Sequence, residues 1–570
     1  MVDQPAGFEL DSRLLGPLPV INHFLGRLGL AGLLESYLPA NDARTRLAPA
    51  SALALVVRNL VIHREPVYGL GQWAARFEPS TLGLRPDEMG LLNDDRIGRV
   101  LARLFDADRA SLLTRLLLDA IGEFGIDCSQ LHNDSTSIKL AGWHARADGH
   151  ARGGKPTVKA ARGHSKDFRP DLKQLVWILT ITADGAVPIA YRVADGNTED
   201  STTHIDTWDG LVALLGRTDF LYVADCKLAT RANMDHIHHG RGRFVSILPA
   251  SRAEDARFRE WVIDHEPDWA HACQRPARRQ DEPDDIYDTV QAPWPSAEGY
   301  RIVWIRSSAK TIRDADARHD RIARGIAALD ELNQRLASPK TRIKTVVAVQ
   351  AAAAAALDKA GAARWIGYQI TEATDQSYRQ EKRGRPGNDT RYRKISRTHH
   401  RVAFHVDENR VAHDAASDGM FPMITNDKRM SAAELLAAYK YQPNLEKRHA
   451  QLKGTQLVAP MFLHDPARIE GLLCCHFIAM LTQALIERTI RVAMAERGIG
   501  ELSLYPEDRG CAAPTAARVL EIFTGLSRHH LRDHHDNLIQ TFEPELTELQ
   551  QHVLDLLQIP TSTYTTAPNE

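Results

Sequence analysis

Three acidic residues, Asp134, Asp225 and Glu446, have the side-chain type and the positions that phosphodiester chemistry requires. Asp134 lies in the segment 129–138, which has the character of a strand, and Asp225 ends the apolar run 219–225, which has the length of a buried strand. Carboxylates on rigid elements bind hard divalent metals, and a metal pair can activate a nucleophile towards a phosphate. The three acids therefore predict a two-metal site that acts on nucleic acid.

The third acid lies in the segment 439–453, where Pro443 suits the first turn of a helix. Helical spacing places Glu446, His449 and Lys453 on one face of that helix. A cation beside the third acid fits a site that also holds a phosphate backbone.

Two basic runs give the chain an uneven charge, although its formal net charge is only −2. Residues 139–173 contain nine Lys and Arg against three acids, and residues 379–401 contain nine against two. Such runs are often solvated loops, but two of them around a set of metal-type acids favour contact with DNA phosphates. In the second run the predicted contacts are Arg391, Arg393 and Lys394.

The composition is that of a globular protein, with 43% hydrophobic and 25% charged residues in a chain of 570. The six cysteines include no CxxC pair, as expected for buried thiols in a reducing compartment. The apolar stretch 471–486 is too short and too polar to span a bilayer, so it predicts a buried helix. Without a signal-peptide pattern, we expect a cytoplasmic protein, nucleoid-associated when bound to DNA, and no membrane partner.

The order of the elements predicts several domains. The first part is helical in pattern, with amphipathic stretches at 20–38, 48–63, 95–105 and 110–124. Strands then follow at 129–138, 175–182 and 187–193, and the hairpin signal Asp184-Gly185 joins the last two. After them come a helix, the strand 219–225, a second helix and the strand 244–248. In this order the first and fourth strands can lie side by side, with Asp134 beside Asp225.

A long insertion separates these strands from the third acid. Antiparallel strands are expected at 365–373 and 401–406, on either side of the second basic run, and Ser431–Glu434 has the form of a capping box. The expected domains are a helical DNA-end-binding module (1–127), the first part of the catalytic domain (128–249), an α+β insert (250–415), the rest of the catalytic domain (416–495) and a small helical C-terminal region (496–570).

Several sequence blocks resemble the DDE transposases of bacterial insertion sequences, in the group with a long insert between the second Asp and the Glu. The most specific block is Gly163-His-Ser-Lys-Asp-Phe-Arg-Pro-Asp-Leu-Lys-Gln174. The others are His132-Asn-Asp-Ser-Thr, Gly196-Asn-Thr-Glu-Asp200, Val223-Ala-Asp225, Asp418-Gly-Met-Phe421 and the Tyr439–Lys453 segment. Together they cover about a third of the chain. The resemblance implies an α/β catalytic domain of the RNase H-like, retroviral-integrase type.

The resemblance also implies roles for individual residues. Asp134, Asp225 and Glu446 would be the catalytic acids and the ligands of Mg²⁺, for which Mn²⁺ would substitute. The family signature Tyr-x2-Arg-x3-Glu-x6-Lys is matched in spacing, but the Arg position holds an amide without charge. The implied DNA contacts are Tyr439, Gln442, Lys453 and Lys166.

The function predicted from these features is that of a DNA transposase. It would hydrolyse phosphodiester bonds at the element's ends and join the freed 3′-hydroxyls to target DNA. Its partners would be double-stranded DNA, as terminal inverted repeats and target, and a second copy of the chain bound to that DNA. Two alternatives stay open: a catalytically inactive DNA-binding protein derived from a transposase, and a stand-alone nuclease of the RNase H type.

Overall fold

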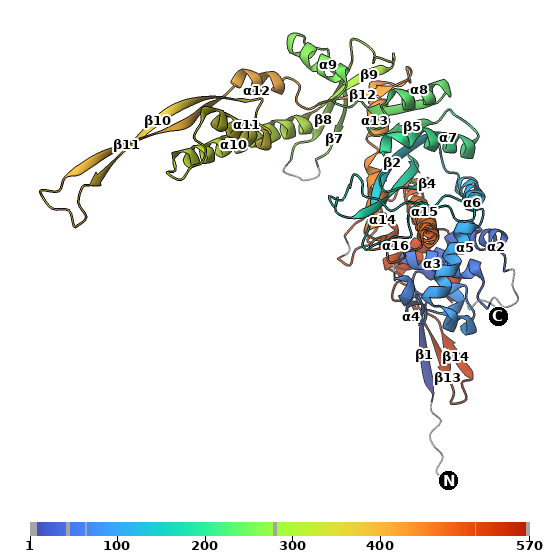
Figure 1. The fold of residues 1–570 in the computed structure, drawn as a ribbon. Coiled ribbons are helices and arrows are strands. Elements are labelled where there is room, and N and C mark those ends of the chain that lie inside the picture. Colours follow the sequence, from blue (N-terminus) through green and yellow to red (C-terminus); the bar gives the residue numbers. More distant parts are fainter. Residues whose placement is uncertain (1–7, 41–45, 63–64, 278–281, 508, 566–570) are drawn as a thin grey trace. The chain divides into compact units, whose positions relative to one another are not determined.

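The computed structural model describes residues 8–40, 46–62, 65–277, 282–507 and 509–565 (Figure 1). Its contacts divide the chain into two compact units. The first unit combines Met1–Ser246 with Ala437–Glu570, and the second is Ile247–Leu436. All three candidate acids belong to the first unit, although 190 residues of the second unit separate Asp225 from Glu446 along the chain.

Five neighbouring strands of the first unit follow the order β4-β3-β2-β5-β6. Their bounds are Gln130–Leu140 (β2), Lys173–Thr182 (β3), Pro188–Ala194 (β4), Leu221–Ala224 (β5) and Arg243–Ile247 (β6). The β2–β3 and β3–β4 pairs are antiparallel, whereas the β2–β5 and β5–β6 pairs are parallel. The first and fourth predicted strands, β2 and β5, are therefore adjacent, which confirms the expected strand order.

Local sequence explains how these elements begin and end. Gly185 has a φ of +75° in the turn from β3 to β4, a conformation that costs an L side chain energy, so the hairpin signal at Asp184-Gly185 is confirmed. The helices expected on either side of β5 are also present. They are α7 (His204–Leu215), which Gly216 ends with a φ of +65°, and α8 (Arg231–His239), which Thr230 caps at its N-terminus.

The core of the first unit is organised around α15 (Pro466–Glu496). This helix is long and apolar enough to cross a membrane, but its apolar window is wholly buried inside the unit. The N-terminal helices and β4 pack against it, and so does the helix that carries Glu446. The prediction of a buried helix at 471–486 is confirmed, with α15 extending beyond both of those ends.

The N-terminal helices belong to the first unit rather than to a unit of their own. Gly29, at a φ of +60°, divides the expected helix at 20–38 into two. The helices are α1 (Leu18–Arg27), α2 (Leu30–Tyr37), α3 (Pro49–Ile62), α4 (Leu70–Ala74), α5 (Asp94–Asp106) and α6 (Arg109–Phe124), with short 3-10 turns between α3 and α5.

The C-terminal region contains strands that the sequence did not predict. Strand β13 (Ser527–Arg532) pairs with β14 (Leu538–Phe542) on one side and with the N-terminal strand β1 (Glu9–Leu14) on the other. The region expected to be helical at 496–570 therefore contains strands as well as helices. Its helices are α16 (Ala516–Glu521), α17 (Glu548–Leu556) and α18 (Ser562–Thr565).

The second unit contains four neighbouring strands in the order β12-β9-β8-β7, and two long helices and a long hairpin lie between β9 and β12 in the chain. The strands are β7 (Ala270–Arg275), β8 (Asp285–Gln291), β9 (Arg301–Ser307) and β12 (Met420–Thr425), and α9 (Ala253–Asp264) precedes them. Each neighbouring pair is antiparallel. Because β12 pairs with β9 from Met420 opposite Arg306, it belongs to the second unit, which extends to Leu436 rather than ending at the expected 415.

The remaining elements of the second unit form a helix pair and a hairpin. Strands β10 (Ile366–Gln380) and β11 (Tyr392–Val406) pair antiparallel over fifteen residues each, and α12 (Glu408–Ala415) follows them. The proximal part of the hairpin shares a hydrophobic core with α10 (Ser308–Ala337) and α11 (Val346–Ala360). In Figure 1 the hairpin continues beyond both helices, and most of its residues from 374 onward are exposed. The two strands expected around the basic run are confirmed.

Candidate active site

Asp134 and Asp225 lie side by side because of the register between β2 and β5. The last residues paired between these two strands are Asn133 on β2 and Ala224 on β5, and an aspartate follows each of them in the chain. Adjacent parallel strands are about 4.8 Å apart, so the two backbones hold the two carboxylates in one neighbourhood. The predicted proximity of these two acids is thus carried by the backbone and does not depend on a loop.

The positive charge of Lys166 is not enough to offset the burial of these two carboxyls. Burial raises the pKa of Asp134, although Lys166 and the amide of Ser135 act in the opposite direction. Burial also raises the pKa of Asp225, and the negative charge of Asp134 raises it further. Each ionised form is disfavoured by desolvation and by its neighbour, which is the electrostatic condition of a site that accepts a cation.

Glu446 reaches this region on a short helix. Ser431 and Glu434 form the predicted capping box that opens α13 (Ala432–Tyr439), and Pro443 occupies the first turn of α14 (Pro443–Lys453), as the sequence predicted. Helix α14 packs against β2. Glu446 is exposed in the first turn of that helix.

The side chain of Tyr439 lies close enough to all three acids for their charges to affect its pKa. Burial raises the pKa of its phenol, and the charges of Asp225, Glu446 and Asp134 raise it further. The side chain is partly buried at the end of α13. The structure therefore places Tyr439 among the acids, where its hydroxyl stays protonated.

Lys166 is the cation closest to Asp134. Its Nζ donates to Asp134 Oδ1 at 3.2 Å, to the carbonyl oxygen of Ser135 at 2.6 Å and to Ser135 Oγ at 3.0 Å. It also forms an ion pair with Asp200 at 3.3 Å. Burial would lower the pKa of Lys166, but Asp134 and Asp200 raise it above its ordinary value. Lys166 thus stays charged and faces the acids.

Asp200 is a site residue that the sequence analysis did not single out. It begins a short 3-10 turn after β4, and its Oδ1 accepts a hydrogen bond from Ser135 Oγ at 2.5 Å. Its position at the end of the block Gly196-Asn-Thr-Glu-Asp200 was the available signal.

Two glycines allow the segments that carry Lys166 and Asp200 to approach each other. A Cβ on Gly163 would lie 2.2 Å from the carbonyl oxygen of Gly196, and a Cβ on Gly196 would lie 2.0 Å from that of Gln174. The side chain of Gln174 donates to the carbonyl oxygens of His164 and Gly196 and joins the two segments. The sequence blocks that begin at Gly163 and Gly196 therefore form one structure beside β2.

His449 is buried one helical turn after Glu446. Its Nδ1 lies 3.8 Å from Asp134 Oδ2, and its Nε2 has no hydrogen-bond partner among the described residues. Burial, together with the charges of Lys166 and Lys453, lowers the pKa of His449 to about 3. The ring is therefore neutral at neutral pH and adds no charge to the site.

Gln442 does not lie where a phosphate could reach it. The side chain is only 8% exposed, and both ends of its amide are used inside the protein. Burial lowers the pKa of His132 to about 4, so His132 is neutral and its Nδ1 lies 2.9 Å from Gln442 Oε1. Gln442 Nε2 donates to the carbonyl oxygen of Asn133 at 3.2 Å. The implied DNA contact of Gln442 is contradicted, because the amide instead ties the start of α14 to the strand that carries Asp134.

Lys453 and Arg448 also have partners within the protein. Lys453 Nζ forms an ion pair with Asp167 at 2.7 Å, next to Lys166 in the sequence. Arg448 is buried, donates to the carbonyl oxygens of Gly185 and Ala186, and pairs with Glu487 at 2.9 Å. Arg448 therefore holds α14 to the β3–β4 turn and does not replace the arginine missing from the signature.

Within the described part of the chain, no group of three or more His, Cys, Asp and Glu side chains is arranged to hold a metal ion. Asp134 is engaged by Lys166 instead. The donor chemistry nonetheless fits a hard divalent cation, because Asp134, Asp225 and Glu446 offer carboxylate oxygens and the charge of Lys166 does not offset the burial of the first two.

The two basic runs differ in how their cations are used. In residues 139–173, Arg152 pairs with Asp106, Lys155 donates to three backbone carbonyls at the end of α5, and Arg169 pairs with Asp171. In residues 379–401 the side chains of Arg391, Arg393 and Lys394 are exposed, and none of them has a partner among the described residues. Of the two runs, the one on the hairpin offers more free positive charge.

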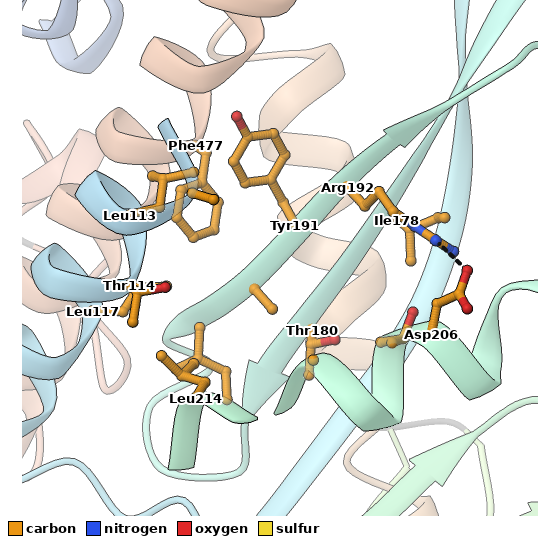
Figure 2. A pocket seen from close by; sticks show the side chains of 15 residues that line it. Leu113, Thr114, Leu117, Ile178, Thr180, Tyr191, Arg192, Asp206, Leu214 and Phe477 are labelled. Atoms are coloured by element: carbon orange, nitrogen blue, oxygen red, sulfur yellow. Dashed lines mark hydrogen bonds and ion pairs between the residues drawn. The ribbon is translucent and has the colours of Figure 1, made fainter. Parts of the chain in front are cut away.

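A separate cavity of about 340 Å³ lies in the first unit, between α6, β3, β4 and α7. Figure 2 shows Leu113, Leu117 and Leu214 among its apolar lining, with Arg192 bonded to Asp206 on one side. None of the three candidate acids lines it. Its chemistry is that of a packing gap behind the sheet rather than of the candidate site.

Comparison with known proteins adds a family match over part of the chain. Residues 10–118 match the model of a domain of unknown function, DUF4277. No curated protein matches the chain. Among solved structures, the chain is similar to the cryo-EM structure of a piggyBac transposase synaptic complex with hairpin DNA, at 7% identity and a TM-score of 0.35, over 98% of this chain and 89% of that one. A likeness this low does not assign a function to the chain.

Proposed function

We propose that the first unit is the RNase H-like catalytic unit of a metal-dependent DNA transposase, with Asp134, Asp225 and Glu446 as its catalytic acids. The observation that carries the proposal is the β2–β5 register, which sets Asp134 beside Asp225 on rigid strands. The strand order β4-β3-β2-β5-β6, with antiparallel pairs among the first three strands and parallel pairs after them, supports an RNase H-like fold. Five of the six sequence blocks that resemble DDE transposases belong to the first unit, as these acids do, and the block at Asp418 belongs to the second.

Asp134, Asp225 and Glu446 would hold Mg²⁺, or Mn²⁺ in its place, and the bound metals would supply activation of the nucleophile and stabilisation of the leaving oxygen. The chain's own residues prepare that site. The β2–β5 pair fixes the first two acids, and the bonds of Gln442 to β2 fix the start of the helix that carries the third. The neutral ring of His449 fills the space behind Asp134 without competing for a cation.

The proposed substrate is double-stranded DNA, as the terminal inverted repeats of the element and as the target. The hairpin β10–β11 is the proposed contact surface of the second unit. Eight Lys and Arg residues against three acids occupy residues 374–398, and Arg391, Arg393 and Lys394 are exposed there. Binding to phosphates would release counterions and gain affinity that depends on salt. We further propose that two copies of the chain act together on the DNA, in the cytoplasm.

Cleavage of labelled duplexes from the two ends of the encoding element tests the proposal. With Mg²⁺ or Mn²⁺ the wild-type chain should cut at the 3′ ends and join them to a target duplex. Asp225→Asn should lower the cleavage rate by on the order of 10³-fold or more while end binding is retained. Asp219→Asn, at the opposite end of the same strand segment and exposed, is the matched control and should cleave normally.

Three results would contradict parts of the proposal. Binding of the ends without any cleavage by the wild-type chain would favour an inactive, transposase-derived DNA-binding protein. Cleavage without joining would favour a stand-alone nuclease. Retention of cleavage by Asp225→Asn would show that the catalytic acid lies elsewhere.

A further inference from the structure

The ammonium group of Lys166 occupies the position among the acids where a cation is expected. Its Nζ lies within 3.3 Å of four oxygen atoms, which belong to Asp134, Asp200 and Ser135. The backbone amide of Lys166 donates to Ser137 Oγ at 3.2 Å, so its segment is also tied to β2. Such a set of oxygen neighbours resembles the coordination of a cation more than it resembles a single surface ion pair.

Asp200 belongs to the same cluster through rigid contacts. Ser135, directly after Asp134, donates from its Oγ to Asp200 Oδ1 at 2.5 Å, while Asp200 Oδ2 faces Lys166 at 3.3 Å. The close approach at Gly163 and Gly196 leaves no room for a Cβ on either residue, and it holds the segment before Asp200 against the segment before Lys166. Asp200 is therefore positioned by the fold and not by the ion pair alone.

A second observation also points to a ligand at this cluster. The imidazole of His449 is buried, its Nδ1 faces Asp134 Oδ2 at 3.8 Å, and its Nε2 has no partner in the described part of the chain. A buried polar atom without a partner costs free energy unless something else satisfies it. The cluster thus has an internal cation beside Asp134 Oδ1 and, facing Asp134 Oδ2, a buried imidazole whose hydrogen-bonding capacity is not fully used.

We infer that Asp200 is a fourth carboxylate of the proposed site, and that Lys166 is a built-in counter-ion which a divalent cation displaces from Asp134. The inference rests on the proposed function for the identity of the cation. Lys166 is then a positioning residue: it holds Asp134 and Asp200 together before the metal arrives and moves away when the metal binds. Asp200 remains as an additional negative charge beside the bound metal.

The two residues should affect metal affinity in opposite directions. Removing the Lys166 charge removes a competitor for Asp134, so a divalent cation should bind more tightly. Removing the Asp200 charge removes an attraction, so the cation should bind less tightly. A unit charge a few ångströms from a divalent cation changes affinity by at least about tenfold, even when the effective dielectric constant is as high as that of water. General damage to the fold would weaken binding in both variants and could not produce opposite signs.

The test is a Mn²⁺ titration of the full chain without DNA, in which the melting temperature is followed as a function of metal concentration. The variants are Lys166→Met and Asp200→Asn, both close in shape to the wild-type side chains. Lys173→Met is the matched control, because Lys173 lies in the same basic run and donates to the carbonyl oxygen of Trp143 instead of to an acid of the site.

We expect the Mn²⁺ concentration at half-effect to fall at least about tenfold in Lys166→Met, to rise at least about tenfold in Asp200→Asn and to stay unchanged in Lys173→Met. Shifts of the first two variants in the same direction, or no shift in either, would overturn the inference while leaving the proposed metal site intact. If Lys166→Met does not fold, an unchanged half-effect concentration in Asp200→Asn overturns it alone. A wild-type chain that does not respond to Mn²⁺ or Mg²⁺ would overturn the proposed metal site, and this inference with it.

Discussion

The acids of the candidate site and the acids of the second unit are placed in opposite electrostatic surroundings. At the site, burial raises the pKa of Asp134 and of Asp225, and the negative charge of Asp134 raises the pKa of Asp225 further. In the second unit, hydrogen bonds from Arg252 lower the pKa of Glu254 to about 2. The pKa of Asp414 is also lowered there, against the effect of burial, by hydrogen bonds from Trp365 and His413 and by Arg364.

This difference in pKa separates acids that stabilise the fold from acids whose charge would be stabilised by a bound ligand. Arg252 pairs with both Glu254 and Glu298, and Arg318 forms a two-bond pair with Asp418 at 2.6 and 2.8 Å. Asp184 of the first unit behaves like the second-unit acids, because Arg488 and the amide of Asp127 lower its pKa against the effect of burial. Among these acids, the exceptions are Asp134 within β2 and Asp225 directly after β5, where the surplus negative charge can be neutralised by a bound cation.

The largest expected effect on stability lies in the second unit. Asp418→Ala leaves Arg318 with its guanidinium buried and without its carboxylate partner, and we expect a loss of about 3 kcal/mol. Hydrogen exchange of the α10 and β12 amides measures it. The double variant Arg318→Met/Asp418→Leu should recover most of the loss, since neither charge is then buried alone. A loss below about 1 kcal/mol would show that this pair acts like an exposed one.

Acidification should reveal the same contrast. Because the pKa of Glu254 in the folded chain is about 2, its pairing stabilises the second unit at pH values above its ordinary pKa of 4.5, and this contribution is lost as the pH falls towards 2. We expect Arg252→Met to cost about 2 kcal/mol at pH 7 and to flatten the dependence of unfolding free energy on pH below 5. Denaturant unfolding at pH 7, 4.5 and 3 tests this, and an unchanged pH dependence would contradict it.

The cations offer a parallel contrast between the two basic runs. We expect a smaller slope of log affinity against log salt in the triple variant Arg391→Ala/Arg393→Ala/Lys394→Ala. Up to three phosphate contacts are lost in it, and each contact contributes about 0.9 to the slope in B-DNA. The control is Arg152→Ala/Arg169→Ala, whose cations already pair with Asp106 and Asp171 and should leave the slope unchanged. Equal slopes for the wild-type chain and the triple variant would show that the hairpin run is merely solvated.

The elements that place Asp134 and Asp225 could be predicted from the sequence because each has a strong local signal. The apolar run 219–225 has the length of a buried strand, and Asp184-Gly185 marks the turn between β3 and β4. Parallel pairing of β2 with β5 then follows from the strand order. The capping box at Ser431 and the proline at 443 marked the starts of α13 and α14 in the same way.

The features that could not be predicted depend on pairs of residues distant in the chain. Strand β1 pairs with β13, more than 500 residues away in the sequence, and β12 pairs with β9, more than 100 residues away. No local sequence pattern predicts either contact. The burial of Gln442 depends on His132, 310 residues away. The place of Asp200 depends on two glycines whose backbones touch, which appears in the sequence only as two separate blocks.

The smallest expected effect is also the most direct test of the contrast between the two groups of acids. Because the pKa of Asp225 is raised, its ionised form costs stability above that pKa, and the cost disappears as the pH falls below the ordinary value of 3.8. Asp225→Asn removes the charge and keeps an oxygen that can accept from the amide of Lys227 at 3.0 Å. In metal-free buffer at pH 7 the variant should therefore be more stable than the wild-type chain by about 1 kcal/mol, with no difference near pH 3.5. The control Asp219→Asn should show no such gain. If the metal-free Asp225→Asn variant is instead less stable than the wild-type chain at pH 7, Asp225 belongs with the acids that stabilise the fold.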